Sequence, residues 1–340
     1  MQQLRPAAGA PSLPPVPADA LLPGLVWAFR FAPDGTPQPM SDAALVSEPG
    51  GWCWLHFNLA DARALQWLAS ADLPPRARQL LLSKDSYQQM HGSEDCVYGV
   101  VADLKRDIAD ITDDTGFLRF VMTENLLISG RHQALCAVDA TRRALERGRR
   151  IESAAALFET IIDEVADAME RVVDGVEHEL DHIEEKVLSD DTADVRQGLG
   201  QTRRSCVRLH RHLSGLRIVL HRFERDSSAD LKPSLQLRAG KLAQRLDSLD
   251  HSVVEMRERS RLLQEELHLQ IEEQTNNSLR VLSVLTALLL PPTLVTGLFG
   301  MNVKGLPFTD TDSGFSWALL LILASSAAAF VVMKRIGLIR

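Results

Sequence analysis

The feature that most constrains this chain is a pair of long uncharged stretches near its C-terminal end. Residues 281–303 and residues 313–333, 23 and 21 positions respectively, contain no Asp, Glu, Lys or Arg. A helix needs about 20 apolar residues to cross the hydrocarbon core of a bilayer. The two stretches therefore predict a membrane protein with a first span at residues 276–300 and a second at residues 314–333.

The rest of the chain is acidic. The 340 residues include 37 basic and 45 acidic side chains, a formal net charge of −8. Residues 276–340 hold 5 basic and 2 acidic side chains, so the remainder carries −11. Because nucleic-acid binding depends on cationic contacts to phosphate, this charge argues against a nucleic-acid partner and suits metal cations.

Residues 1–23 contain six prolines and no apolar core, which indicates a flexible tail rather than a secretory signal. The cysteines are scattered without C-x-x-C spacing, so they predict neither a zinc knuckle nor a disulfide framework. We interpret them as small packed hydrophobic residues in a reducing compartment: Cys53, Cys96, Cys136 and Cys206.

Residues 24–148 predict an α/β domain, because short β-rich runs alternate with helical patterns. Asp61 is a suitable N-cap for one short helix, and Pro74-Pro75 opens a second. Strands are predicted at residues 25–31, 52–57, 96–104, 117–123 and 125–130.

Residues 149–275 predict a helical stalk with breaks near Gly148, at residues 189–192 and at residues 226–233. No strong breaker follows Ser234 until Pro291, which predicts one helix continuing to Gly300. An apolar stripe typical of bundle packing runs along it: Leu242, Leu246, Leu249, Val253, Met256, Leu263, Leu267 and Ile271. The predicted fold is an α+β membrane protein.

The charges flanking the spans predict their orientation. The loop at residues 301–313 carries Lys304, Asp310 and Asp312, whereas the tail at residues 334–340 carries three basic residues. The positive-inside rule places this tail in the cytoplasm and the loop in the periplasm. Two spans then leave the soluble domain, and hence both termini, in the cytoplasm.

A polar stripe follows the first span in alternating steps of three and four. It marks either a tight helix contact or a water-filled path. Two helices cannot enclose a pore, but a ring of identical subunits can. The stripe consists of Asn276, Leu279, Ser283, Thr286, Leu290, Thr293, Gly297 and Gly300.

The same stripe extends backward into the stalk through several glutamates. In a ring of subunits they would form an acidic funnel; in a single chain they are the solvated face of the stalk. These residues are Glu255, Glu258, Glu265 and Glu272.

Gly300-Met301-Asn302 follows the first of two C-terminal spans, within LTALLLPPTLVTGLFGMNVKGLPF. With the stalk and the α/β domain before it, this arrangement resembles the CorA superfamily of divalent-cation transporters, most of all its zinc-associated ZntB branch. The resemblance implies a funnel-shaped homopentamer in the bacterial inner membrane. It also implies transport of Zn²⁺ first, with Mg²⁺, Co²⁺, Ni²⁺ and Cd²⁺ as further cargo, and it allows proton coupling.

The resemblance implies roles for individual residues. Gly300, Met301 and Asn302 would form an outer filter whose oxygen atoms bind a hydrated cation. The pore-facing places fall on Asn276, Leu279, Leu282, Leu290 and Thr293.

Three features depart from the family pattern. Lys304 lies just beyond the filter, where a ring of ammonium groups would repel cations, although Asp310 and Asp312 leave the mouth at −1 per subunit. Lys241 lies in a stalk region where many CorA proteins have a metal-sensing carboxylate, and the basic tail is thin. We therefore do not extend magnesium-gated closure, a property of the family, to this protein.

His178 and His182 satisfy the H-E-x-x-H pattern of zinc proteases. Because the motif is surrounded by acidic residues, we favour a solvated helix over a peripheral zinc contact or a protease. His210, His212 and His221 lie among arginines, which favours a solvated or salt-bridged helix over a metal site.

No phosphate-binding glycine motif occurs, so neither a nucleotide partner nor hydrolysis is expected, and no catalytic residue is assigned. The sequence predicts a divalent-cation transporter, most of all for Zn²⁺, driven by an ion gradient or the membrane potential, and not an enzyme. A Mg²⁺, Co²⁺ or Ni²⁺ channel on the same scaffold, or a membrane-anchored helical scaffold without transport, remain the alternatives.

Overall fold

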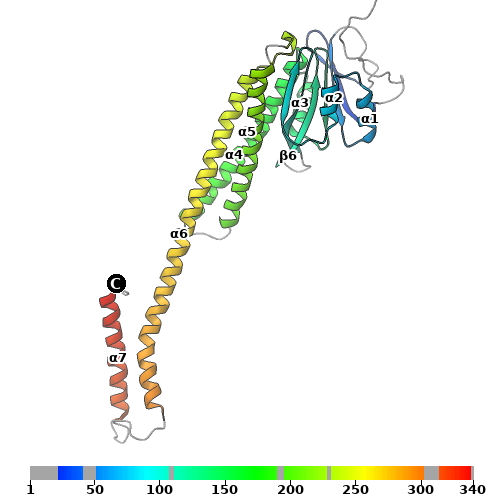
Figure 1. Ribbon diagram of the computed structural model, residues 1–340. Helices are drawn as coiled ribbons and strands as arrows, with labels where there is room; N and C mark the ends of the chain where they lie inside the picture. The colour runs from blue at the N-terminus through cyan, green and yellow to red at the C-terminus, as the bar shows by residue number, and fades with distance from the viewer. Residues whose placement is uncertain are drawn as a thin grey trace, which may run out of the picture. The chain divides into compact units, whose positions relative to one another are not determined.

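The computed structural model describes residues 22–40, 51–106, 111–189, 195–227, 231–301 and 314–337. They form two compact units that divide between Leu263 and Gln264. Helix α6 (Ala239–Phe299) contributes residues to both units (Figure 1). Each unit is described by itself below.

The first unit is built on a seven-stranded sheet. Its strand order is β2-β1-β3-β7-β6-β5-β4, in which β3 and β7 are parallel and all other neighbours are antiparallel. The strands are β1 (Leu25–Phe31), β2 (Pro37–Met40), β3 (Trp52–Asn58), β4 (Gln89–Ser93), β5 (Cys96–Arg106), β6 (Ile111–Met122) and β7 (Leu126–Arg131).

The two parallel strands owe their central position to nearly continuous apolar sequence. In β3, WCWLHFN, every residue except Asn58 is buried, and in β7, LLISGR, every residue except Arg131 is buried. A strand covered on both faces requires such a run rather than an alternation of polar and apolar residues. The sheet is therefore the middle layer of this unit.

Helices α1 (Ala62–Ser70) and α2 (Pro75–Leu82) cover one face of the sheet. Asp61 caps α1 by accepting a 2.9 Å hydrogen bond from Arg63 N, and α2 begins at a proline, whose missing N–H costs nothing in a first helical turn. Their buried Leu68 and Leu81 pack with Leu55 and other sheet residues.

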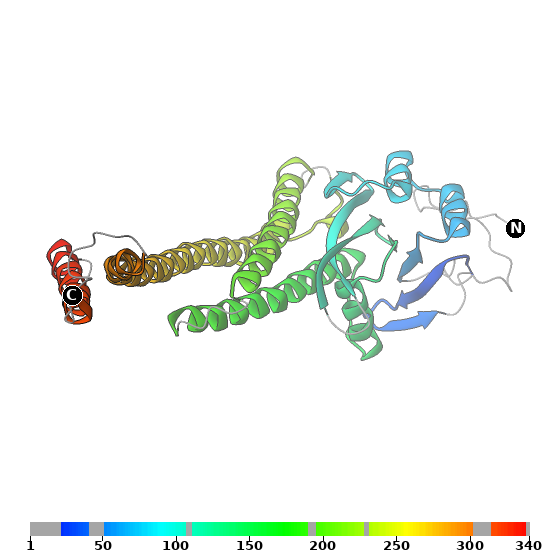
Figure 2. The ribbon, with the colours of Figure 1, turned by 90° about the horizontal axis from the view of Figure 1, so that it is seen from below.

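Helices α3 (Cys136–Glu146) and α4 (Ala154–Leu188) pack on the other side of the sheet. Phe158 of α4 lies against Phe120 of β6, with ring centroids 4.1 Å apart. The Asp103 carboxylate on β5 accepts a 3.0 Å hydrogen bond from Ala137 N at the start of α3. Figure 2 shows the strands between the blue helices α1 and α2 and the green helix α4.

Helix α5 (Val195–Ser227) packs against α4, and a series of ion pairs joins α4 to α6. Glu159, whose side chain is 8% exposed, accepts hydrogen bonds from Arg238 N and from the Arg238 guanidinium. Further along, Arg245 pairs with Asp163, Asp167 and Glu170, and Arg259 pairs with Asp181 and Glu184. Acidic residues of α4 therefore meet basic residues of α6 over most of the length of α4.

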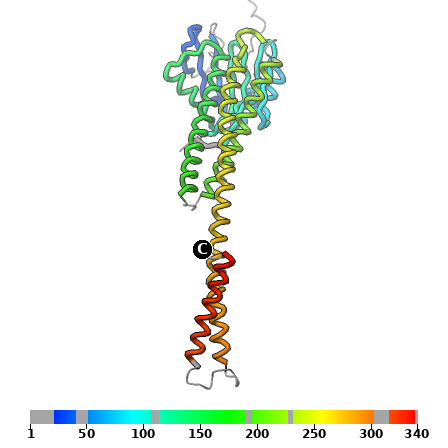
Figure 3. The backbone as a smooth tube through the Cα atoms, turned by 90° about the vertical axis from the view of Figure 1, so that its left-hand side faces the viewer, coloured from blue at the N-terminus to red at the C-terminus, as the bar shows by residue number. Residues whose placement is uncertain are grey.

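The second unit contains the C-terminal part of α6 and α7 (Gly314–Ile336), which lie alongside each other (Figure 3). Both helices contain an apolar stretch long enough to cross a membrane, with none of that stretch buried. Arg280 Nη2 donates a 3.2 Å hydrogen bond to Gly337 O, which ties the start of one span to the end of the other. Gly337, at a φ of 79°, ends α7 in the left-handed conformation that favours glycine.

The structure confirms each predicted strand and both predicted short helices, and it adds strands β2 and β4. The long helix begins at Ala239 rather than Ser234, because residues Pro233–Leu235 form a 3-10 turn before it. All four cysteines are free and buried. Ile271, which is 41% exposed, is the exposed member of the predicted apolar stripe.

Candidate functional site

The polar stripe lies on the C-terminal half of α6, within the second unit. Each of its members is exposed in the single chain, as is the neighbouring Leu282. Leu279, Leu282 and Leu290 are 57%, 60% and 60% exposed. An apolar helix surface of this extent needs lipid or further protein to cover it.

The hydroxyl groups of the stripe bond to the helix that carries them. Ser283 Oγ donates to Leu279 O and Thr286 Oγ1 to Leu282 O, each at 2.8 Å, and Thr293 Oγ1 donates to Leu289 O at 2.9 Å. Each hydrogen is thus directed one turn back, which leaves the oxygen lone pairs as acceptors on the helix surface. Acceptor oxygens suit the water molecules of a hydrated cation.

Two adjacent prolines, Pro291 and Pro292, lie inside α6. Proline has no N–H, so the carbonyls of Ala287 and Leu288 receive no helical hydrogen bond from the next turn. Within a bilayer, such carbonyls need a partner from protein or from water. This level of the span is therefore not suited to complete burial in lipid.

The helix tightens and ends where the outer filter is predicted. Gly300 N donates to Thr296 O at 2.8 Å, Met301 N donates to Leu298 O, and Met301 is 54% exposed. Asn302 lies outside the described residues, as do the predicted mouth residues Lys304, Asp310 and Asp312. The filter therefore stays a prediction.

The four funnel glutamates are exposed. In the first unit, Glu255 and Glu258 lie on the opposite side of α6 from the buried Val253, Met256 and Leu263. In the second unit, Glu265 and Glu272 are exposed, and Glu272 lies 3.3 Å from His268 of the same helix. One chain brings together no metal cage from these residues.

Arg280 was not singled out in the sequence, although its charge immediately precedes the first uncharged stretch. Its bond to Gly337 places it at the same end of the helix pair as Lys334 and Arg335. It therefore joins Lys334 and Arg335 at the end that the positive-inside rule assigns to the cytoplasm.

His178 and His182 are exposed on α4, where Asp181 of the same motif pairs with Arg259 at 2.8 Å. Within the described ranges, no group of three or more His, Cys, Asp or Glu side chains is arranged to hold a metal ion. A catalytic zinc needs three protein ligands. The exposure of both histidines and the Asp181–Arg259 pair support a solvated, ion-paired helix at this motif.

The histidines of α5 are likewise parts of the helix packing. His210 Nδ1 lies 2.6 Å from Asp250 Oδ1 of α6. Burial first, and the nearby Arg211 and Arg208 second, lower the pKa of His212. These contacts agree with the predicted salt-bridged helix.

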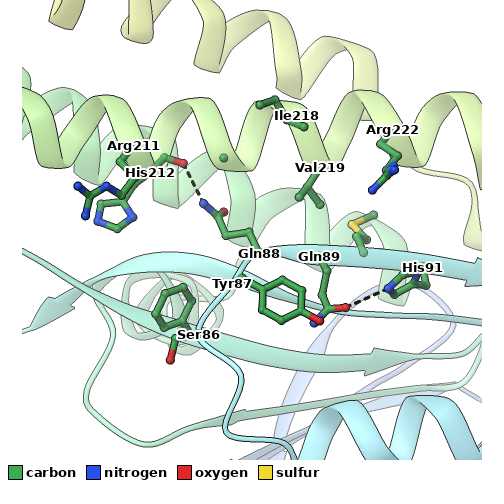
Figure 4. A pocket seen from close by; sticks show the side chains of 13 residues that line it. Ser86, Tyr87, Gln88, Gln89, His91, Arg211, His212, Ile218, Val219 and Arg222 are labelled. Carbon is green, nitrogen blue, oxygen red and sulfur yellow. Dashed lines mark hydrogen bonds between the residues drawn. The ribbon is translucent and has the colours of Figure 1, made fainter.

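The first unit contains a cavity of about 610 Å³ between α5 and β4 (Figure 4). Gln88 bridges its walls by donating to His212 O at 3.1 Å and accepting from Ala102 N. Arg211 and Arg222 lie towards opposite ends of the view, with Ile218 and Val219 between them. The lining surface is largely apolar, and among the described residues no acidic side chain lines it.

Comparison with known proteins decides the family. The family described as "CorA-like Mg2+ transporter protein" matches residues 49–335, a range that includes strands β3 to β7, the long helices and both apolar spans. The chain belongs to the CorA-like family. Its members transport divalent cations and are not enzymes.

Individual relatives agree with this assignment. The zinc transport protein ZntB of Klebsiella pneumoniae is 22% identical over 315 residues, 91% of this chain and 94% of that protein. The structure of full-length CmaX matches with a TM-score of 0.79 and 25% identity, covering 93% of this chain and 99% of that one. The CorA magnesium transporter of Methanocaldococcus jannaschii matches with a TM-score of 0.71 and 18% identity, covering 92% and 99%.

Proposed function

We propose that this CorA-like protein is a homopentamer of the bacterial inner membrane that passes divalent cations, Zn²⁺ first, through a pore lined by the C-terminal half of α6. The observation that carries the proposal is the polar stripe, whose members are all exposed in one chain, on a helix whose apolar stretch contains no buried residue. Symmetric association would bring five copies of that stripe around one axis. The proposed boundaries are the predicted ones, with spans at residues 276–300 and 314–333.

The lining chemistry fits a hydrated divalent cation. The hydroxyls of Ser283, Thr286 and Thr293 present acceptor oxygens, and residues 281–303 contain no carboxylate that would bind the ion tightly. Weak oxygen contacts allow an ion to enter and also to leave. Gly300, Met301 and Asn302 would form the filter at the outer end.

The charge distribution supports attraction of cations on both sides of the pore. The soluble part carries −11 per chain, and Glu255, Glu258, Glu265 and Glu272 are exposed on the helix leading to the span. Lys304, Asp310 and Asp312 leave the outer mouth at −1. Both ends therefore favour cations over anions.

The uncharged span bears on energy coupling. The membrane potential supplies about 2.3 kcal/mol per elementary charge per 100 mV, enough to move a divalent cation inward. If protons are coupled to this movement, they must use the funnel, the mouth or a co-moving ion, since residues 281–303 hold no ionisable side chain. Arg280, Lys334 and Arg335 support a cytoplasmic location of both termini.

We place zinc first because two relatives that cover 90% or more of this chain are zinc transport proteins named ZntB. The family description and the Methanocaldococcus structure name magnesium, which favours a Mg²⁺, Co²⁺ or Ni²⁺ channel as the second candidate. Competition between these ions and ⁶⁵Zn²⁺ in proteoliposomes distinguishes the two candidates. A scaffold without transport would show no flux of any of them.

The filter provides the direct experiment. Asn302→Ala is expected to abolish ⁶⁵Zn²⁺ flux into proteoliposomes while the oligomer stays intact. Asn277→Ala is the matched control, since Asn277 is exposed on α6 but lies off the stripe. Undiminished flux in Asn302→Ala, or equal loss in both variants, would remove the filter assignment.

A further inference from the structure

A second cavity of the first unit is unlike the rest of this acidic chain. It has a volume of about 410 Å³ and is lined by residues that follow α2, by β5 and β6, and by residues that follow β7. Its charged lining residues are Lys84, Lys105 and Arg119, and among the described residues no Asp or Glu lines it. Three cations thus converge in a unit whose formal charge is strongly negative.

Arg119 is the inner cation of this cavity. The residue is 3% exposed, and its guanidinium donates to two backbone carbonyls, from Nε to Ser83 O at 2.8 Å and from Nη2 to Asp85 O at 2.7 Å. Carbonyls fix the orientation of the guanidinium without neutralising its charge. Burial lowers the pKa of Arg119, but a guanidinium stays protonated at neutral pH.

His132 adds a polar edge beside Arg119. Its Nδ1 lies 3.4 Å from Arg119 Nη1. Partial burial first, and the cations of Arg119 and Lys84 second, lower the pKa of His132. The imidazole is therefore neutral at pH 7, and with Nδ1 accepting from Arg119 its Nε2 carries a hydrogen to donate.

Thr115 supplies an independent sign that a ligand group is missing. Thr115 is one of the lining residues, and its hydroxyl oxygen is buried and has no hydrogen-bond partner within the described part of the chain. A buried hydroxyl left unpaired costs stability, so such groups are normally satisfied by water or by a ligand. Thr115 can donate to an acceptor that lies between it and the cations.

The acidic groups that the structure places near the cations of this cavity, Asp114 and Asp85, are not among the lining residues. Asp114, whose side chain is 60% exposed, lies 3.7 Å from Lys105 Nζ. Asp85 favours the charged form of Arg119 electrostatically, yet it is not among the lining residues. The remaining attraction suits a ligand with more than one negative charge and several acceptor oxygens.

We propose that this cavity binds a phosphate-type oxyanion, held by Lys84, Arg119 and Lys105 with hydrogen bonds from Thr115 and His132. Phosphate oxygens are strong acceptors for guanidinium and ammonium groups and match this set of donors. The site lies in the sheet-containing unit, so it is independent of the proposed pore. The cavity of Figure 4 shares Ser86 and Phe117 with it but is largely apolar.

Calorimetric titration of the full-length protein in detergent with pyrophosphate, in metal-free buffer at physiological salt, tests the proposal. Saturable binding of one pyrophosphate per chain is expected. Lys84→Gln, at an exposed position, should weaken it about tenfold, the loss of one charge-assisted contact. Absence of saturable binding at millimolar pyrophosphate would overturn the proposal.

Two control variants remove a positive charge elsewhere in the first unit. Arg222→Gln lies in the neighbouring cavity and Lys241→Gln on the exposed surface of α6, and both should bind pyrophosphate as the unaltered protein does. A loss in either control as large as that in Lys84→Gln would show that general charge, not this cavity, holds the anion.

Thr115→Val provides a readout that a purely structural role would not give. It removes the unpaired hydroxyl at nearly constant volume, so we expect weaker pyrophosphate binding without a lower melting temperature. Unchanged affinity would contradict the role given to Thr115.

Dioctanoyl phosphatidic acid, used as a competitor of pyrophosphate, distinguishes the two sources of phosphate. Displacement assigns the site to a lipid headgroup, and no displacement assigns it to a soluble phosphate.

Discussion

Helix α6 behaves differently in the two units to which it contributes. In the first unit, most of its apolar residues are buried, and its Arg245 and Arg259 pair with carboxylates of α4. In the second unit, residues 281–299 of the same helix carry no charged side chain, and no residue of its apolar window is buried. The first region is completed by its own chain, whereas the second needs lipid and further copies.

The largest expected effect tests whether the polar stripe and the other sides of the first span differ in their surroundings. Thr286→Lys should assemble but lose zinc flux by more than about 100-fold, because the proposed axis is wet and five ammonium groups there repel cations. Leu285→Lys, on another side of the helix, should impair membrane insertion, since a lysine at mid-span costs about 2.5–3.5 kcal/mol. Flux into proteoliposomes and the yield of the detergent-solubilised oligomer measure the two effects. Equal behaviour of the two variants would contradict a water-facing side of α6.

The next largest effect concerns the first unit, where the ion pairs form within one chain. Glu159→Ala removes the charge-assisted hydrogen bonds to Arg238 and should destabilise the first unit by about 2 kcal/mol. For a unit of this size that corresponds to a fall of about 4–8 °C in melting temperature. Glu255→Ala, at an exposed position of α6, should lower it by less than about 1 °C. Equal shifts would mean that the ion pairs do not stabilise the region.

A smaller effect concerns the pH dependence of stability in the first unit. Burial raises the pKa of Asp103 to about 7, so between pH 4 and pH 7 the folded protein holds its proton more tightly than the unfolded chain. The contribution of Asp103 to stability is therefore present at low pH and is lost as pH rises through 7. From pH 5 to pH 8, the melting temperature of the native protein should fall relative to that of the Asp103→Asn variant. Parallel changes in both proteins would contradict the assignment.

The smallest effect is expected on the second span. Ser325 Oγ donates to Ile322 O of its own helix, α7, which is not assigned to the pore. Ser325→Ala should change zinc flux by less than about twofold. A strong loss, measured beside Thr293→Ala in the same vesicles, would move part of the lining to α7.

The sequence predicted the features that depend on local pattern. Strand β3 was predictable because its run is apolar throughout, and the polar stripe followed from helical spacing alone. Strands β2, PQPM, and β4, QMHGS, were missed because each lies at a sheet edge and carries little apolar sequence.

Features that join distant residues needed the structure. The bond from Arg280 to Gly337 spans 57 positions, and that from Glu159 to Arg238 spans 79. The cavity of Arg119 and His132 depends on the pairing of β6 with β7, which aligns Arg119 with Gly130. Asn302, by contrast, was singled out by its motif and lies outside the described residues.

The central claim, that copies of α6 turn one side toward a common aqueous axis, is tested most directly by modification of Thr293→Cys with a membrane-impermeant cationic thiol reagent during zinc flux. Leu298→Cys is the comparison, and the native cysteines are buried. We expect the reagent to modify Thr293→Cys and stop its flux while Leu298→Cys stays unmodified and active. Protection of Thr293→Cys together with rapid modification of Leu298→Cys would contradict the proposed pore.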